Sequence, residues 1–128
     1  PASPSFPRAM SNASSGNAAA PSLLVGWTTF SRRAEAEAFA EDVVTRGWVI
    51  CAQIDAPIVS IYRWQGKLER GEEVRLTLKF PPQHAGALDR HLRDHHPYET
   101  PEWIVVAASH VAEKYLSWAK ANPSTPPL

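Results

Sequence analysis

The strongest constraint on the fold is a long β-hairpin pattern in the middle of the sequence. Residues 48–64 are rich in amino acids that favour strands, interrupted near Pro57, which cannot donate a ladder hydrogen bond. Gln65 and Gly66 suit a two-residue turn, after which residues 67–80 return as a strand that alternates apolar and polar side chains towards its end. The two arms are longer than a domain of this size requires. We therefore expect the end of the hairpin to project from its own subunit and to pair with another subunit.

Strand and helix patterns alternate on both sides of this hairpin. They predict a buried strand at 22–30, a helix at 32–46, a second helix at 84–95, a strand covered on both faces at 103–108 and a final helix at 111–121. We expect the hydroxyl of Ser31 to cap the first helix. This order predicts an α+β fold, a ferredoxin-like βαββαβ sandwich with a four-stranded antiparallel sheet, two helices on one face, the long hairpin and an added C-terminal helix.

The length and the composition of the two ends predict one domain between two tails. A chain of 128 residues suffices for one hydrophobic core, which we place at residues 22–121. Residues 1–21 contain four Pro, five Ser and six Ala but no acidic residue, so we expect a flexible N-terminal tail. Residues 122–128 are rich in proline and predict a C-terminal tail.

Charge and cysteine content argue against several classes of function. The 13 basic and 13 acidic residues balance, so we expect no nucleic-acid partner and no membrane partner. Cys51 is the only cysteine, which fits a reducing, cytoplasmic location, and we interpret it as a small buried residue inside a strand. We find no nucleophile–base arrangement, no phosphate-binding glycine loop and no organic-cofactor motif. The sequence therefore predicts no catalytic residue and no enzyme activity.

A short polar stretch between the second helix and the last strand concentrates groups that bind metals or move protons. It reads His95-His96-Pro97-Tyr98-Glu99-Thr100-Pro101-Glu102, and its two prolines stiffen the backbone. A stiff loop can hold His95 and Glu102 in a fixed relation, as a coordinating pair requires. The other interpretation is a helix-to-strand connector whose polar side chains lie in water, and the spacing alone leaves both open.

Three histidines of the second predicted helix form a row along one border of its apolar stripe. His84, His91 and His95 recur at spacings of seven and four. Such a row can bind a metal ion, but a partly solvated row is the more common arrangement. We therefore do not assign His84 and His91 as metal ligands.

Four segments carry a resemblance to a known family. They are Cys51-Ala52-Gln53-Ile54, residues 60–69 (SIYRWQGKLE), residues 95–102 (HHPYETPE) and Tyr115-Leu116-Ser117-Trp118. In this order and at this spacing, they make the chain from about Leu23 to Trp118 similar to the CutA family of divalent-cation-tolerance proteins. The resemblance implies a ferredoxin-like domain assembled as a homotrimer, in which the long hairpins extend sheets between subunits.

The resemblance also implies a Cu(II) site built from a thiolate, an imidazole and a carboxylate. The imidazole and the carboxylate correspond to His95 and Glu102, whereas Trp27 stands at the position of the thiolate. An indole offers no lone pair to a metal ion. The remaining nitrogen and oxygen ligands imply weak binding of Cu(II) or another divalent cation.

Two functions follow from these observations. The first is a metal-ion-response protein, a cytoplasmic trimer that binds a divalent cation through the loop at 95–102. The alternative is a regulatory or scaffold trimer, similar in architecture to the PII signalling proteins, that binds a small molecule or a protein partner without metal. Its ligand would lie in a cleft between subunits lined by Tyr62, Trp64, Lys67 and Tyr98. Packing within the trimer also accounts for Tyr62 and Trp64, because interface cores are enriched in aromatic residues.

Overall fold

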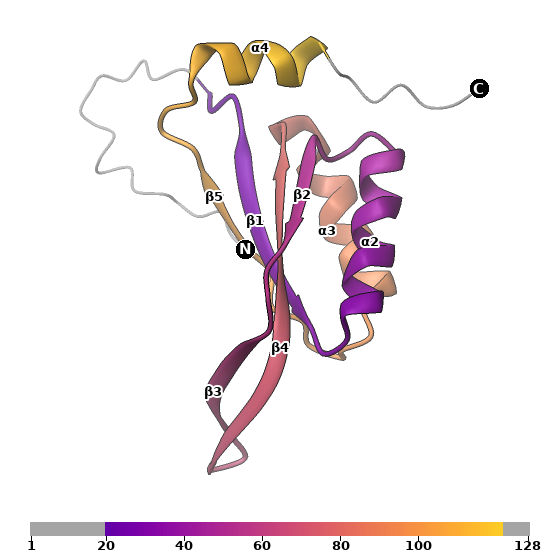
Figure 1. Cartoon of the computed structure of the whole chain (residues 1–128), viewed down its shortest axis with the longest axis vertical. Helices are drawn as coiled ribbons and strands as arrows, with labels where there is room; N and C mark the ends of the chain where they lie inside the picture. Colours follow the sequence, from indigo (N-terminus) through magenta and orange to yellow (C-terminus); the bar gives the residue numbers. More distant parts are fainter. Residues whose placement is uncertain (1–19, 122–128) are drawn as a thin grey trace.

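A computed structural model describes residues 20–121 of the chain (Figure 1). The predicted tail at 122–128 and nearly all of the predicted tail at 1–21 lie outside the described residues. The elements are, in order, β1 (Leu24–Phe30), α2 (Arg33–Thr45), β2 (Cys51–Ile54), β3 (Ile58–Trp64), β4 (Lys67–Phe80), the short 3-10 helix η1 (Pro82–His84), α3 (Ala85–His95), β5 (Ile104–Ala107) and α4 (Glu113–Ala121).

The strands form one antiparallel sheet with helices α2 and α3 on one face (Figure 1). The strand order is β2-β4-β1-β5, and β3 pairs with the distal part of β4. Two split βαβ units produce this order, so the predicted α+β class with an antiparallel sheet is confirmed. Helix α4 lies at the end of the sheet away from the hairpin. None of the helices within residues 20–121 has the length and apolar character that a bilayer-spanning segment needs.

The hydrophobic core lies between the sheet and the helices α2 and α3. The alternating apolar residues of β4 are all buried, as predicted: Val74, Leu76, Leu78 and Phe80. The apolar face of α2 is buried against the same core: Ala36, Phe39, Ala40 and Val43. Leu88 and Leu92 of α3 complete this cluster. Each large side chain buried here contributes roughly 1.5–3 kcal/mol to folding.

The opposite face of the sheet is covered less completely. Trp27 of β1 lies opposite Thr77 of β4 and Ile104 of β5, in register with the strand positions that point away from the core. Ile104 is 53% exposed. The expectation of a last strand covered on both faces is therefore wrong for the isolated chain, because both sheet-covering helices lie on one side.

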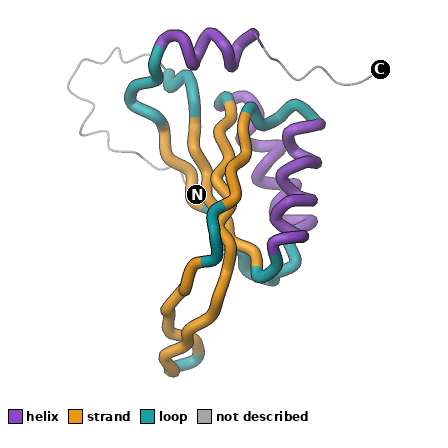
Figure 2. The backbone as a smooth tube through the Cα atoms, viewed as in Figure 1, coloured by secondary structure: helices purple, strands orange, loops and turns teal. Residues whose placement is uncertain are grey.

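The projecting hairpin is confirmed. Strand β3 and the distal part of β4 extend away from the body (Figures 1 and 2). The backbone angle φ is 51° at Gln65 and 79° at Gly66, as a type I′ two-residue turn requires. The hairpin exposes large apolar side chains, each by at least half of its surface: Val59, Ile61, Tyr62, Trp64 and Leu68.

Two local predictions are wrong. Ser31 does not cap helix α2, because the helix begins at Arg33 and its N-cap residue is Arg32, which makes no side-chain hydrogen bond there. The Ser31 side chain instead hydrogen-bonds Tyr98. Cys51 is only half-buried, because it lies at the start of β2 opposite Lys79, on the less covered face of the sheet.

Candidate functional site

The polar stretch at 95–102 begins at the end of α3, where the helix stops as predicted. His96 takes an extended backbone conformation, because the following Pro97 disfavours a helical one. The side chain of His96 then turns inward and is buried, with only 8% of its surface exposed. Its ring stacks on Phe30 at 4.3 Å between centroids. The loop is therefore anchored to β1 by a residue that sequence reasoning treated only as part of the motif.

Hydrogen bonds fix the protonation of His96. The backbone N–H of Tyr98 donates to Nδ1 (3.0 Å), so this nitrogen carries no proton. The Nε2–H donates to the carbonyl of Thr29 (2.8 Å). Burial lowers the pKa of His96 below its ordinary value, although the Thr29 hydrogen bond and the carboxylates of Glu35 and Glu73 act in the opposite direction. Because both nitrogens of the neutral imidazole are already hydrogen-bonded, His96 holds the loop in place and is not available as a metal ligand.

Tyr98 attaches the same loop to the base of the hairpin. Its hydroxyl donates to Oε2 of Glu73 (2.8 Å), and the hydroxyl of Ser60 donates to Oε1 (2.6 Å). Glu73 lies opposite Ile58, where β3 begins. Burial and the Glu73 hydrogen bond raise the pKa of Tyr98 to about 12, so the phenol stays protonated as a donor. One carboxylate thus connects the loop to both hairpin strands.

His95 is the residue of the loop that retains an available nitrogen. Its ring nitrogen Nδ1 lies 3.0 Å from the carbonyl oxygen of His91, and only a protonated nitrogen can donate to a carbonyl. In the neutral imidazole Nε2 then carries the lone pair. His95 is exposed and lines a cleft of about 320 Å³ together with Glu35, Asp42 and His91.

Sequence reasoning missed the partner of His91. Ring nitrogen Nε2 of the buried His91 lies 2.6 Å from Oδ2 of Asp42, and Arg46 binds the other carboxylate oxygen at 2.9 Å. Burial raises the pKa of Asp42, but the hydrogen bonds from His91 and Arg46 outweigh it, and the net pKa lies below its ordinary value. The only signal in the sequence was the histidine row itself, because Asp42 lies 49 positions away from His91.

The histidine row does not form one site. The rings of His91 and His95 lie 4.2 Å apart, but His84 lines a separate cavity. Within residues 20–121, no three His, Cys, Asp or Glu side chains are grouped as metal ligands. The structure therefore contains no preformed three-ligand centre among the described residues.

The three positions to which the resemblance assigns a metal site lie on different parts of the chain. His95 ends α3 on the helix-covered side of the sheet. Trp27 lies half-buried in β1 on the other side, opposite Thr77. Glu102 is exposed in the segment that leads into β5. The carboxylates that line the cleft beside His95 are those of Glu35 and Asp42.

The four residues proposed for an inter-subunit cleft also separate within one chain. Trp64 pairs with Lys67 at the end of the hairpin, and Tyr62 pairs with Glu69. Tyr98 instead binds Glu73, four residues further along β4, which corresponds to about 13 Å of strand. Such a cleft would require residues from more than one subunit.

Comparison with known proteins places these features in a family. Residues 24–122 match the family model of the CutA1 divalent ion tolerance protein. The divalent-cation tolerance protein CutA of Citrobacter koseri is 37% identical over 102 residues, which cover 80% of this chain and 89% of that protein. The protein of the same name from Salmonella newport shows the same identity and coverage.

Solved structures agree with the sequence comparison. CutA1 from the psychrotrophic bacterium Shewanella sp. SIB1 superposes with a TM-score of 0.77 at 28% identity, covering 84% of this chain and all 100% of that one. CutA from Synechococcus elongatus superposes with a TM-score of 0.75 at 32% identity, covering 80% and 90% of the two chains. These structures confirm the mixed α+β fold and its antiparallel sheet. The chain belongs to the CutA1 divalent ion tolerance family.

Proposed function

We propose that this protein binds a divalent cation, with Cu(II) as the first candidate, through the imidazole of His95. The observation that carries the proposal is the contact of His95 Nδ1 with the carbonyl of His91, which leaves the lone pair of Nε2 for a ligand. Histidines that bind metals usually have their second ring nitrogen fixed by such a bond. The family name, divalent ion tolerance, supports a metal ion as the relevant ligand.

The oxygen ligand has two candidates. The resemblance assigns Glu102, whereas Glu35 lines the cleft beside His95 in this chain. Asp42 is the poorer candidate, because His91 and Arg46 already occupy both of its oxygens. With Trp27 at the position of the family's thiolate, the soft ligand is missing, and we expect weak binding completed by water.

The test is calorimetric titration of the metal-free protein with Cu(II) and with Zn(II) near neutral pH. We expect one saturable site per chain, and we expect His95→Ala to weaken it at least tenfold. His84→Ala is the matched control, because His84 lines a different cavity, and it should leave the affinity unchanged. Equal affinities in the His95→Ala variant and the unaltered protein would refute His95 as the ligand.

A second titration identifies the oxygen ligand. Glu102→Gln and Glu35→Gln each retain the size of the side chain but remove its charge. Loss of affinity in the Glu102 variant alone would support the ligand pair implied by the family. Loss in the Glu35 variant alone would place the ion in the cleft between α2 and α3.

We further propose that the chain acts as a homotrimer in the cytoplasm. The supporting observation is the exposed apolar surface of the hairpin, because monomeric proteins rarely leave such a patch uncovered. Ile104 and the half-buried Trp27 add apolar surface on the less covered face of the sheet. The number three rests on the resemblance to the CutA family.

The regulatory alternative rests on the end of the hairpin. Tyr62 and Trp64 are both exposed there, and Lys67 supplies a positive charge beside Trp64. In a trimer these side chains would line a cleft with residues of a neighbouring subunit. Metal titrations without a saturable site would favour this function over cation binding.

A further inference from the structure

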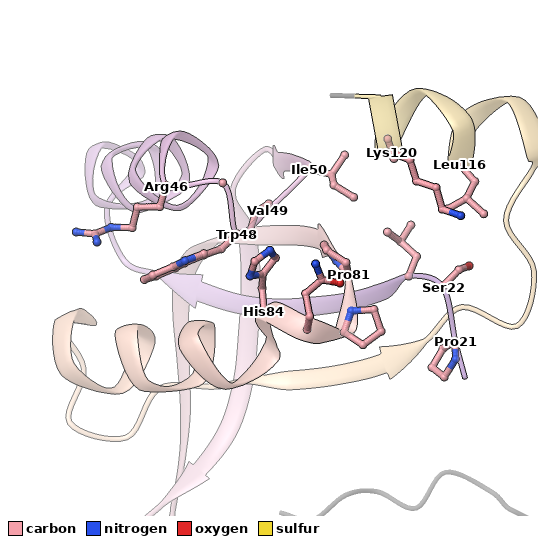
Figure 3. Close-up of a pocket in the computed structure, with 15 residues that line it drawn as sticks. Pro21, Ser22, Arg46, Trp48, Val49, Ile50, Pro81, His84, Leu116 and Lys120 are labelled. Carbon is pink, nitrogen blue, oxygen red and sulfur yellow. The ribbon is translucent and has the colours of Figure 1, made fainter. Parts of the chain in front are cut away.

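A cavity lies at the end of the sheet opposite the hairpin, away from His95. It has a volume of about 920 Å³, within the range of small-molecule sites. Four segments enclose it: residues 21–23 before β1, residues 46–50 after α2, residues 81–84 around η1, and one face of α4 (Figure 3). Segments distant in sequence thus converge on one concave surface.

The walls of this cavity are largely apolar. Leu23, Val49 and Ala119 line it and are themselves buried, so its floor belongs to the packed part of the protein. The indole of Trp48 and the side chain of Leu116 form further apolar parts of the wall (Figure 3). Such a wall favours a ligand with an apolar, flat body.

The charged lining has a single sign. The cationic side chains are those of Arg46 and Lys120. The neutral polar lining includes the imidazole of His84, and the lining includes no Asp or Glu. Arg46 is already engaged, because Asp42 binds it at 2.9 Å and its guanidinium lies 5.1 Å above the Trp48 ring. Figure 3 shows the Arg46 side chain extending away from Lys120 and Leu116.

Lys120 differs from Arg46 in this respect. It takes part in none of the ion pairs found within residues 20–121. In Figure 3 its side chain extends from α4 towards Ser22, and His84 rises between Trp48 and Pro81. A cation and an imidazole from two separate elements therefore face the same apolar cavity without an acidic partner in its lining.

We propose that this cavity binds a small organic anion with a flat apolar body. The Lys120 ammonium group meets the anionic group, and the apolar lining beside it, which includes Leu116, packs against the body. The N-terminal residues 1–20 do not match this chemistry, because they contain one basic residue, Arg8, and no acidic residue. The site is independent of the metal proposed at His95.

The experiment uses the fluorescent anion 8-anilinonaphthalene-1-sulfonate and the full chain. We expect saturable binding, and we expect Lys120→Glu to weaken it at least tenfold by replacing an attractive charge with a repulsive one. Lys114→Glu makes the same charge change on the same helix outside the cavity, and it should leave the affinity within about twofold. Thermal unfolding of both variants verifies that they fold.

A second probe and a second variant test whether binding depends on the charge of Lys120 and takes place in this cavity. The uncharged analogue N-phenyl-1-naphthylamine should bind with an affinity that Lys120→Glu does not reduce. Equal weakening of the anion by Lys120→Glu and Lys114→Glu would overturn the proposal. Loss of dye binding in Ile61→Asp, with no effect of Lys120→Glu, would also overturn it, because the dye would then lie on the exposed hairpin.

Discussion

His96 determines how the polar loop is held to the rest of the molecule. Its Nδ1 accepts the Tyr98 N–H and its Nε2–H donates to Thr29, so both nitrogens are used in the neutral form. Protonation of Nδ1 would place a hydrogen against the Tyr98 N–H and would bury a charge. The folded state therefore disfavours protonation, in agreement with the lowered pKa.

A pH dependence of stability follows. The unfolded chain protonates His96 near the ordinary pKa of 6.5, whereas the folded chain does so only at lower pH. The free energy of unfolding should therefore decrease as the pH falls below about 6.5, by at most ~1.4 kcal/mol per pH unit for one proton. Thermal unfolding between pH 8 and pH 5 measures this slope.

The matched variants separate His96 from the other histidines. His96→Gln should flatten the dependence at the cost of lower stability at pH 8. His110→Gln changes an exposed histidine and should leave the profile as it is. An identical slope in the unaltered protein and in His96→Gln would contradict the assignment.

Sequence reasoning located the right loop but not the roles of its residues. The prolines correctly predicted where α3 ends, because their effect on the backbone is local. The anchoring of His96 to Thr29 spans 67 positions, and that of Tyr98 to Glu73 spans 25. Contacts between such distant residues depend on the packed fold, so no local pattern encodes them. His95 and Glu102 stay predictions as metal ligands.

At the scale of the elements, Gly26 of β1 leaves room for the side chain of Trp103, which directly precedes β5. A Cβ atom at Gly26 would lie 2.5 Å from Cη2 of Trp103. The Trp103 ring stacks on Phe80, with centroids 6.1 Å apart, and packs against the core cluster. Gly26 therefore provides the space in which the indole closes one end of the core.

A substitution of Gly26 tests this packing. Gly26→Ala should lower the free energy of unfolding by roughly 1–3 kcal/mol, because the added methyl group forces the indole out of its place. Gly71→Ala is the matched control in β4, since a Cβ there meets no atom within 4 Å. Urea unfolding of both variants gives the comparison, and equal stabilities would show that Trp103 yields without strain.

Periodicity predicted most elements because it reflects burial directly. The apolar face of α2 and the alternation at the end of β4 were both confirmed. The predicted burial of Cys51 was wrong because of how two strands are paired. The ladder places Cys51 opposite Lys79 on the less covered face, and the register between two strands was not readable from either strand alone.

At the scale of the whole molecule, the hairpin stands out because no other part of residues 20–121 covers its apolar side chains. Its five large apolar side chains are exposed, and its strands extend away from the core (Figure 2). A two-stranded ribbon without a covering layer is only marginally stable in water. Contact with other subunits would supply that layer.

The oligomeric state measures this contribution. Ile61→Asp places a charge on the hairpin and should shift the proposed trimer towards monomers in sedimentation velocity. Val44→Asp makes the same change at an exposed position of α2, 37% accessible against 59% for Ile61, and should leave the trimer intact. A trimer that persists in the Ile61 variant would argue that assembly uses another surface.

The contacts of the Glu73 carboxylate also affect the direction in which the hairpin projects. From Glu73 to Lys67 the strand runs six residues, or about 20 Å. A tilt of about 5° at the base would then displace the end by roughly 1.7 Å, by simple geometry on that strand length. The hydroxyl groups of Ser60 and Tyr98 hold this carboxylate at the base of the hairpin. A small change of angle there produces a larger displacement at the end of the hairpin. In the proposed trimer, the alignment of Trp64 with a neighbouring subunit would thus depend on contacts far from Trp64 itself.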